Sequence, residues 1–174
     1  GRIETPDELK LQFPLAKELL GYMGIKYYEC DNYEADDIIG TFANIVEKDP
    51  NFTGTIVSSD KDLLQLISSS VDIKLLKQKD YIRYNEESFK EAYGINPINV
   101  IDLKALMGDA SDNIPGVAGV GEKTALKLLN QYKTLDGIYN NIDSINGKLK
   151  EKLVNDKDSA YFSYKLATIE KNIP

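Results

Sequence analysis

The stretch Gly108–Leu129 reads GDASDNIPGVAGVGEKTALKLL, and the rest of the 174-residue chain is interpreted around it. Its first part carries two carboxylates, Asp109 and Asp112, which are oxygen donors suited to a hard divalent cation. Its second part is a glycine-rich turn, Pro115–Gly121, that leads directly into an apolar-periodic helix. Backbone amides at such a turn and helix N-terminus form a site for phosphate. A cation site and a phosphate site so close together favour a protein that acts on nucleic acid.

The composition excludes several classes of protein. A hydrophobic share of 42% and a charged share of 28% are typical of a soluble globular domain. No membrane-length apolar run and no signal peptide are present, and the single cysteine suits a reducing compartment, so we expect no membrane partner and a cytoplasmic location. Because the chain has no histidine, His-based zinc sites and Ser-His-Asp triads are excluded. Any metal would be held by oxygen, which favours magnesium or manganese.

The charge distribution is uneven along the chain. The net charge of −7 argues against a nucleic-acid partner when it is taken as a sum. The acids, however, gather in the first 62 residues, while the last third carries many of the lysines: Lys123, Lys127, Lys133, Lys148, Lys150 and Lys152. A molecule with an acidic end and a basic end remains compatible with DNA.

The apolar periodicity predicts an α/β fold, in which a partial parallel sheet flanked by helices occupies residues 1–94 and a helical region occupies residues 95–174. A capping box at Thr5–Glu8 predicts the first helix, with a kink or break near Pro14 and a stop at Gly24. Strands are expected at 25–30, 54–58, 71–76 and 81–84. Further helices are expected at 34–48, with Ile38, Ile39, Phe42, Ile45 and Val46 on the buried side, and at 61–67, 86–93, 97–107, 121–131, 134–141, 147–155 and 157–169.

Two groups of acidic residues follow predicted strands. Glu34, Asp36 and Asp37 come after the strand expected at 25–30, and Asp60 and Asp62 come after the strand at 54–58. If these strands are parallel neighbours, both groups lie at the carboxyl edge of one sheet, where such sheets bind ligands. The loop with Asp109 and Asp112 could fold over the same edge. Carboxylates gathered there would repel one another without a cation, and two magnesium ions would relieve the repulsion and hold a phosphodiester for attack by water.

Simpler interpretations of the same residues remain open. The acids at 34–37 could merely favour a helix N-terminus, and Asp60 could cap the short helix that follows it. An Asp-x-Asp after a strand also begins the haloacid-dehalogenase-type phosphatases, but their signature continues with small residues and a threonine, whereas Leu63, Leu64 and Gln65 follow here.

The glycine turn has its own alternatives. Gly116, Gly119 and Gly121 permit positive φ and can present amides outward, while Lys123 and Thr124 on the first helical turn can reach a phosphate. An ATP-binding P-loop needs lysine directly after its last glycine, and here Glu122 intervenes and no strand precedes the turn. A plain helix–turn–helix corner, with glycines for close packing, is the alternative.

Three linked motifs resemble a known family. YEADD (33–37), SSDKDLLQL (58–66) and the stretch at 108–129 stand in the order and spacing of the 5′→3′ exonuclease domain of bacterial DNA polymerase I, a member of the structure-specific flap-endonuclease family with a PIN-like nuclease core. The resemblance covers essentially the whole chain. It implies a metal-dependent enzyme of replication and repair that hydrolyses DNA phosphodiesters as a 5′→3′ exonuclease or 5′-flap endonuclease.

The resemblance also implies roles for individual residues. Glu34 and Asp36 resemble ligands of a first Mg²⁺ or Mn²⁺ ion with Asp37 close behind, and Asp60, Asp62 and Asp112 resemble ligands of a second ion with Asp109 beside them. The segment Gly116–Gly121 with Lys123 and Thr124 resembles a helix–hairpin–helix that grips duplex DNA around a potassium ion. The implied partners are double-stranded DNA with a 5′ flap, nick or end, and a covalent polymerase domain downstream.

One departure from the family limits these expectations. The N-terminal strand that supplies two more aspartates to the first metal is absent from this chain, and so is the helical arch. We therefore expect an excised fragment with a half-built first metal site, impaired as a nuclease, whose exposed sheet edge or apolar face favours dimerisation or low stability. The competing hypotheses are a non-catalytic DNA-binding module and a magnesium phosphatase that acts on small molecules.

Overall fold

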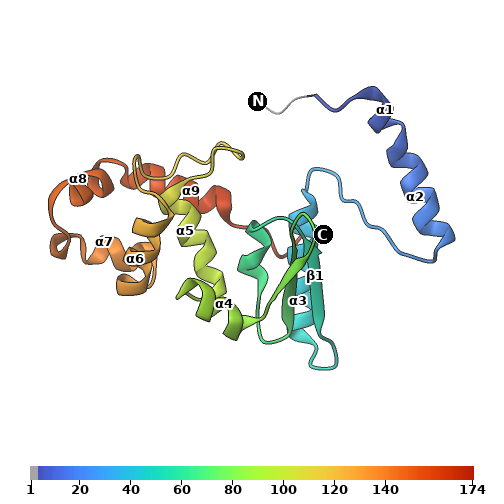
Figure 1. Cartoon of the computed structure of the whole chain (residues 1–174), viewed down its shortest axis with the longest axis horizontal. Helices are drawn as coiled ribbons and strands as arrows, with labels where there is room; N and C mark the ends of the chain where they lie inside the picture. Colours follow the sequence, from blue (N-terminus) through green and yellow to red (C-terminus); the bar gives the residue numbers. More distant parts are fainter. Residues whose placement is uncertain (1–3) are drawn as a thin grey trace.

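A three-stranded sheet forms the centre of the first half of the molecule. The computed structural model describes residues 4–174, and its strands are β1 (Gly54–Ser58), β2 (Val71–Leu76) and β3 (Tyr81–Tyr84), in the order β1-β2-β3. β1 runs parallel to β2, whereas β3 is antiparallel to β2. Helix α3 (Ala35–Lys48) packs against β1 and β2 (Figure 1). The predicted α/β class is confirmed, with the parallel pairing confined to two strands.

The remaining helices follow the predicted ranges closely. After β1 comes the 3₁₀ helix η1 (Asp62–Leu66), and the elements after β3 are all helices, the last of which ends at Ala167. The elements of this part are α4 (Glu86–Tyr93), η2 (Pro97–Asn99), α5 (Val100–Met107), α6 (Glu122–Tyr132), α7 (Leu135–Asn140), η3 (Ile142–Ser144), α8 (Gly147–Asn155) and α9 (Lys157–Ala167).

Helix α5 is the centre of the helical half. All of its residues from Val100 to Leu106 are buried, and it packs against α6, α9 and η1. Its Asp102 is buried too, and the carboxylate accepts hydrogen bonds from Asn99 Nδ2 at 2.9 Å and from Leu135 N at 2.7 Å. These bonds join α5 to the start of α7 and satisfy a charge that would be costly to bury alone. The apolar core continues from the sheet into this half without a break.

Two glycines shape the loop between α5 and α6. Asp109 and Ile114 exchange two main-chain hydrogen bonds of 2.8 Å, which close the loop that carries Asp112. At its base Gly108 has φ 69° and Gly116 has φ 63°. A Cβ at Gly116 would lie 2.3 Å from Gly108 N, so the two backbones meet where no side chain fits.

The strand predicted at 25–30 is wrong. Ile25–Cys30 is extended but belongs to no strand, because within residues 4–174 no segment pairs with it. Instead it passes over the outer face of α3, where the rings of Tyr28 and Phe42 lie 4.9 Å apart. The proposed parallel pairing between this segment and β1 is therefore also wrong, since β1 pairs with β2.

The first predicted helix is two helices. α1 (Asp7–Lys10) and α2 (Gln12–Tyr22) are separated at Leu11, three residues before Pro14, and Gly24 follows the second with φ 71°. The predicted capping box at Thr5 is wrong, because Pro6 takes the N-cap position and offers no side-chain oxygen. Together α1 and α2 form an arm that projects from the body of the molecule (Figure 1). None of the helices within residues 4–174 is both long and apolar enough to span a membrane.

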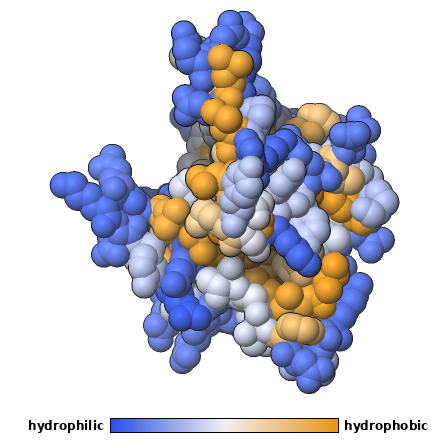
Figure 2. Space-filling view, turned by 90° about the vertical axis from the view of Figure 1, so that its right-hand side faces the viewer, coloured by the Kyte–Doolittle hydropathy of each residue, from blue (hydrophilic) through white to orange (hydrophobic). Residues whose placement is uncertain are grey.

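The buried face of α3 agrees with the prediction in part, since Ile39 and Val46 pack against the core as predicted. Gly40 and Ala43 are its buried residues, while Phe42 is 42% and Ile45 55% exposed. The face of the molecule that includes the arm carries several patches of apolar side chains (Figure 2). Large apolar side chains are exposed on α2, α3 and β1: Phe13, Leu15, Leu19, Tyr22, Phe42, Ile45 and Val57. Dimerisation through this surface stays a prediction.

The close contact between Gly108 and Gly116 predicts a difference between two glycine substitutions. Gly116→Ala should destabilise the protein by about 2–5 kcal/mol, because it combines the cost of left-handed backbone with a main-chain clash. Gly121→Ser is the matched control in the same turn. Gly121 has φ −97° and nothing within 4 Å of an added Cβ, and serine is a good N-cap residue.

The measurement is urea denaturation followed by circular dichroism. Gly121→Ser should stay within about 0.5 kcal/mol of the unsubstituted chain. Equal midpoints for Gly116→Ala and Gly121→Ser would show that the two backbones can separate at no cost.

Candidate functional site

Acidic side chains from three separate segments line one cleft. The cleft has a volume of about 740 Å³ and is called the acidic cleft below. Its walls are the loop 110–114 and the chain segment 166–169. Its carboxylates come from the start of α3, the turn after β1 and the loop after α5: Glu34, Asp36, Asp37, Asp60, Asp62 and Asp112.

The N-terminus of α3 presents the first three acids. Glu34 is the N-cap residue, and its amide donates to Asp37 Oδ2 at 3.2 Å. Asp37 Oδ1 accepts a second hydrogen bond, from the amide of Glu170 at 3.0 Å. Asp37 therefore fixes the helix start to a distant part of the chain, and Asp36 beside it is half-buried and lines the cleft. Carboxylates here also interact favourably with the helix dipole.

A tight turn after β1 presents the next two acids. The amide of Asp60 donates to Ser58 Oγ at 3.0 Å, and the amide of Asp62 donates to Asp60 Oδ1 at 2.8 Å. These side-chain to main-chain bonds end the strand and begin η1. Because α3 packs against both β1 and η1, this turn and the start of α3 share the acidic cleft.

The ammonium group of Lys104 lies among three carboxylates. Its Nζ is hydrogen-bonded to Asp62 Oδ2 and lies 3.0 Å from Asp109 Oδ2 and 3.3 Å from Asp112 Oδ2. Burial alone would lower the pKa of Lys104, but the hydrogen bonds to Asp62 and Asp109 outweigh it and raise the pKa to about 12. Lys104 is therefore a cation fixed at the centre of the acids.

Asp62 and Asp109 respond to this environment in opposite ways. Burial raises the pKa of Asp62, although Lys104 opposes the shift. The pKa of Asp109 falls to about 2, first because the Ser111 hydroxyl donates to its Oδ1, with Lys104 adding to the effect. The Ser111 amide donates to the same oxygen at 2.8 Å. Asp109 thus shapes the loop. Its side chain lines a second cavity next to the acidic cleft, and Asp112 lines both the cleft and this second cavity.

Among residues 4–174, no lysine or arginine forms an ion pair with Asp36 as Lys104 does with Asp62. Burial, with a smaller contribution from the neighbouring carboxylates of Asp60, Asp62, Glu34 and Asp37, raises the pKa of Asp36 to about 6. The acidic cleft therefore carries more negative charge near Asp36 than the protein itself neutralises. A divalent cation bound there would relieve this repulsion.

The carboxylates of the acidic cleft are the right kind of ligand for a hard metal ion, but they are not spaced as a metal site in this structure. Six carboxylates line the acidic cleft, and oxygen ligands are those that magnesium and manganese prefer. Within residues 4–174, however, no three acidic, histidine or cysteine side chains are arranged around one point as metal ligands. Lys104 draws Asp62, Asp109 and Asp112 toward its own ammonium group. A metal ion would have to attract side chains away from it.

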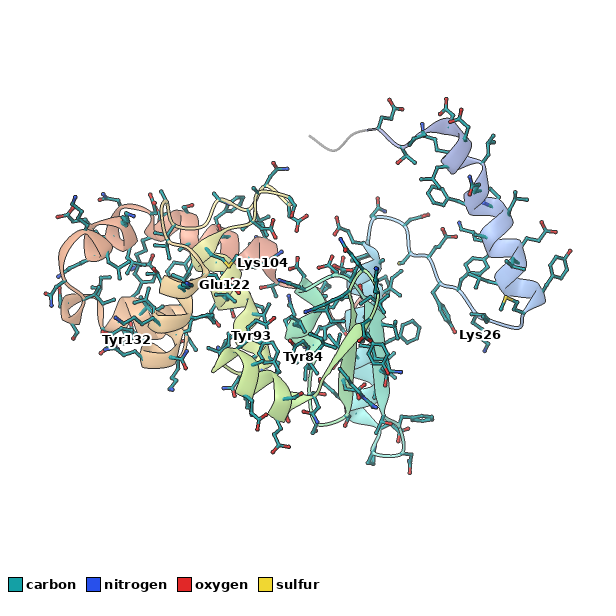
Figure 3. All side chains as sticks on the ribbon, in the orientation of Figure 1. Lys26, Tyr84, Tyr93, Lys104, Glu122 and Tyr132 are labelled. Carbon is teal, nitrogen blue, oxygen red and sulfur yellow. The ribbon has the colours of Figure 1, made fainter. Side chains whose placement is uncertain are left out.

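Sequence reasoning missed Lys104. It lies within VIDLKALM, an otherwise largely apolar helix, and a lysine at a buried position is rare unless it is paired. That burial signal was available, but its partners were not, because they come from η1 and from the loop after α5. Glu122 was also missed. It lines a second cavity of about 540 Å³ together with Lys104 and Tyr93, and in Figure 3 Lys104 and Glu122 lie near each other.

The glycine turn is held by side chains of α8 and α9. The amide of Gly116 donates to Ser163 Oγ at 2.9 Å, and its carbonyl accepts from Ser159 Oγ at 2.7 Å. The amide of Ala118 donates to Asp156 Oδ2 at 2.8 Å, and Lys152 Nζ donates to the carbonyl of Gly119 at 2.9 Å. The prediction that these amides point outward for a phosphate is therefore wrong at Gly116, whose amide is used within the protein.

The N-terminus of α6 is the more open part of this region. Gly121 is its N-cap residue, with φ −97°, so of the three glycines that permit positive φ only Gly116 and Gly119 adopt it. Lys123 is exposed and Thr124 half-buried in the first helical turn. Neither lines the acidic cleft, so they form a separate surface beside it.

Comparison with known protein families accounts for the whole chain. Residues 1–94 match the family model described as 5′-3′ exonuclease, N-terminal resolvase-like domain, and residues 95–174 match the model described as 5′-3′ exonuclease, C-terminal SAM fold. A DNA polymerase I of Streptococcus pneumoniae strain R6 is 50% identical over all of this chain, which corresponds to 20% of that protein. The chain thus spans about a fifth of the length of the curated relatives that it matches.

Solved structures share the fold. A zinc-bound 5′-exonuclease of bacteriophage T5 matches with a TM-score of 0.76 and 21% sequence identity. The match covers 96% of this chain and 64% of the phage exonuclease chain. A flap endonuclease of the same phage, in a pseudo-enzyme-product complex with DNA and metal ions, has a TM-score of 0.75 at 21% identity and covers 98% and 63%. The resemblance of the three motifs is confirmed, and the chain belongs to the 5′-3′ exonuclease family.

Proposed function

We propose that this chain is part of a metal-dependent nuclease that hydrolyses DNA phosphodiesters near a 5′ end, as a 5′→3′ exonuclease or 5′-flap endonuclease. The observation that carries the proposal is the acidic cleft, where carboxylates from three segments face one another. The relatives support it, since they include DNA polymerase I and a phage flap endonuclease with DNA and metal ions. Replication and repair in the cytoplasm, and a covalent polymerase domain, are proposals of the same kind.

The proposed roles follow from how each acid is held. Glu34, Asp36, Asp60, Asp62 and Asp112 are the proposed catalytic ligands, because all of them line the acidic cleft. Both oxygens of Asp37 accept main-chain amides, and Asp109 Oδ1 accepts from Ser111 while its Oδ2 lies against Lys104, which favours a role for these two acids in orienting the others. A bound Mg²⁺ or Mn²⁺ pair would supply an activated water and charge neutralisation at the phosphate.

The proposed DNA contacts lie on α6. Lys123 and Thr124, with the open amides of the helix N-terminus, are placed to contact phosphates without reading base sequence. A potassium ion at the glycine turn finds less support. The Gly119 carbonyl already accepts a hydrogen bond from the Lys152 ammonium, which supplies positive charge at that oxygen.

The first prediction separates a nuclease from a non-catalytic DNA-binding module. The double substitution Asp60→Asn and Asp62→Asn keeps the oxygen that accepts the Asp62 amide but removes two charges from the acidic cleft. Mn²⁺ affinity, measured by calorimetry, should fall at least about 10-fold. A module whose acids are only structural would bind Mn²⁺ equally with and without the substitutions.

Cleavage gives a second readout of the same variant. Turnover of a labelled 5′-flap duplex in Mg²⁺ should be low for the 174-residue chain and lower still for the double variant. Turnover by this chain equal to that of a relative's complete nuclease domain would contradict the proposed half-built first metal site.

Another prediction concerns the effect of the Asp36 carboxylate on the stability of the protein at different pH values. The raised pKa of Asp36 means that the folded protein keeps this proton up to about pH 6, while the unfolded chain loses it near the ordinary value of 3.8. The free energy of unfolding therefore falls as the pH rises through this window. Asp36→Asn should stabilise the metal-free protein at pH 8, on the order of 1–2 kcal/mol after screening, and leave it unchanged at pH 3.

Urea denaturation at the two pH values measures this difference. In saturating Mg²⁺ the advantage of Asp36→Asn should shrink or reverse, since the carboxylate then has a cation to bind. A variant that is less stable than the unsubstituted chain at pH 8 without metal would show that Asp36 is not repelled in the cleft.

The third prediction concerns the α6 surface. Lys123→Ala should weaken duplex binding about 3–10-fold for any sequence and reduce the slope of log affinity against log salt by about one. Lys48→Ala is the matched control, because Lys48 lies at the end of α3 away from the acidic cleft. Fluorescence anisotropy at several KCl concentrations measures both. A small-molecule phosphatase would show no duplex affinity in either variant.

A further inference from the structure

One buried amide joins the two halves of the molecule beside the acidic cleft. Gln65 lies in η1, three residues after Asp62, and is 2% exposed. Its Nε2 donates to the carbonyl of Ala167 at 2.9 Å, and its Oε1 accepts from the amide of Ile169 at 3.1 Å. Both polar atoms of this side chain are therefore paired with one short piece of main chain, as a neighbouring strand would pair with it.

That piece of main chain begins a segment that runs back along α3. Residues 167–173, called the C-terminal strap, leave α9 and return to the side of the molecule that holds the sheet, where the C-terminal residues lie beside α3 (Figure 1). The amide of Glu170 donates to Asp37 Oδ1 at 3.0 Å. Farther along, Asn44 Nδ2 donates to the carbonyl of Lys171 at 2.9 Å, and the amide of Ile173 donates to Thr41 Oγ1 at 3.2 Å.

The strap packs so closely against α3 that only glycine fits at position 40. A Cβ at Gly40 would be 2.7 Å from Ile169 Cγ2 and 3.0 Å from the carbonyl oxygen of Glu170. Ala167 and Ile169 are both buried, and both line the acidic cleft. The strap is therefore one wall of the cleft as well as a tie between its two groups of acids.

The other end of the strap leads to the glycine turn. It continues directly from α9, whose Ser163 is fully buried and accepts the Gly116 amide, and whose Ser159 donates to the Gly116 carbonyl. A continuous set of bonds thus runs from the glycine turn through α9 and the strap to Gln65, and from Glu170 to Asp37. The strap is thus bonded both to η1, through Gln65, and to the start of α3, through Asp37.

We propose that Gln65 is a positioning residue, which fixes the C-terminal strap and through it the position of the acids of α3 relative to those of η1. This inference rests on the proposed function of the acidic cleft. Gln65 does not line the cleft and acts only through the strap. Its side chain competes with no ligand, so its loss should change metal affinity by moving the acids and not by removing a donor.

The test compares Gln65→Met with Thr41→Val. Methionine conserves volume and apolar packing but removes both hydrogen bonds of Gln65. Valine at position 41 removes a strap bond of the same kind, to Ile173, beyond the contact with Asp37. Mn²⁺ affinity, followed by the electron paramagnetic resonance signal of the free ion, should weaken about 10-fold in Gln65→Met and less than about 2-fold in Thr41→Val.

Hydrogen exchange supplies a readout that needs no metal. In Gln65→Met the amides of Ile169 and Glu170 and those at the start of α3 should lose protection, while the amides of Gly116 and Ala118 keep theirs. Gly40→Ala pushes on the same strap from the other side, so it should lower Mn²⁺ affinity too, and the effect of combining it with Gln65→Met should be less than additive.

The outcomes distinguish this inference from the function on which it rests. If the unsubstituted chain binds no Mn²⁺, the proposed function fails. If the unsubstituted chain binds Mn²⁺ and Gln65→Met binds it equally well, or if Thr41→Val is as impaired as Gln65→Met, the positioning role of Gln65 is wrong. Protection lost across the whole chain in Gln65→Met would assign Gln65 to global stability and would also overturn the proposal.

Discussion

The repulsion among the carboxylates of the acidic cleft is the constraint on which the rest of the site depends. Like charges this close are unfavourable unless a cation lies between them. Lys104 meets that requirement for Asp62, Asp109 and Asp112, because α5 brings its ammonium group to within hydrogen-bonding distance of them. In the part of the chain that the structure describes, no cation is paired with Asp36 in this way, and burial together with the neighbouring carboxylates raises its pKa to about 6. The protein neutralises one side of the cleft and leaves the other side charged, which is the side where a metal ion would gain most.

The same arrangement ties folding to function. Asp37 and Asp109 each use oxygens to accept main-chain amides, so these carboxylates hold the backbone that presents the other acids. Gly108 and Gly116 meet backbone to backbone and bring the loop of Asp112 next to the glycine turn. The acidic cleft and the start of α6 are therefore built on one rigid connection.

The apolar surface on α2, α3 and the outer side of β1 has a different physical meaning. Within the described residues, the arm of α1 and α2 does not pack extensively against any other helix or strand. Helices in proteins gain most of their stability from such packing. Exposed apolar patches of this kind are unfavourable in water, and dimerisation is one way to cover them. The missing partner also explains why residues 25–30 do not form the predicted strand. An extended segment becomes a β-strand only when a neighbouring strand pairs with it, and none does so within the described residues.

The sequence by itself determined the elements and the donor chemistry. Local periodicity located β1 to β3 and the helices from α3 onward, because short-range spacing encodes them, and the absence of histidine left only oxygen ligands. The tertiary structure alone decided how these parts meet. It paired β1 with β2, placed Lys104 among three carboxylates, and joined Gln65 to main chain about a hundred residues away. It also showed that Gly121 needs no left-handed backbone. Contacts between residues distant in sequence depend on which surfaces pack together, and no local pattern carries that information.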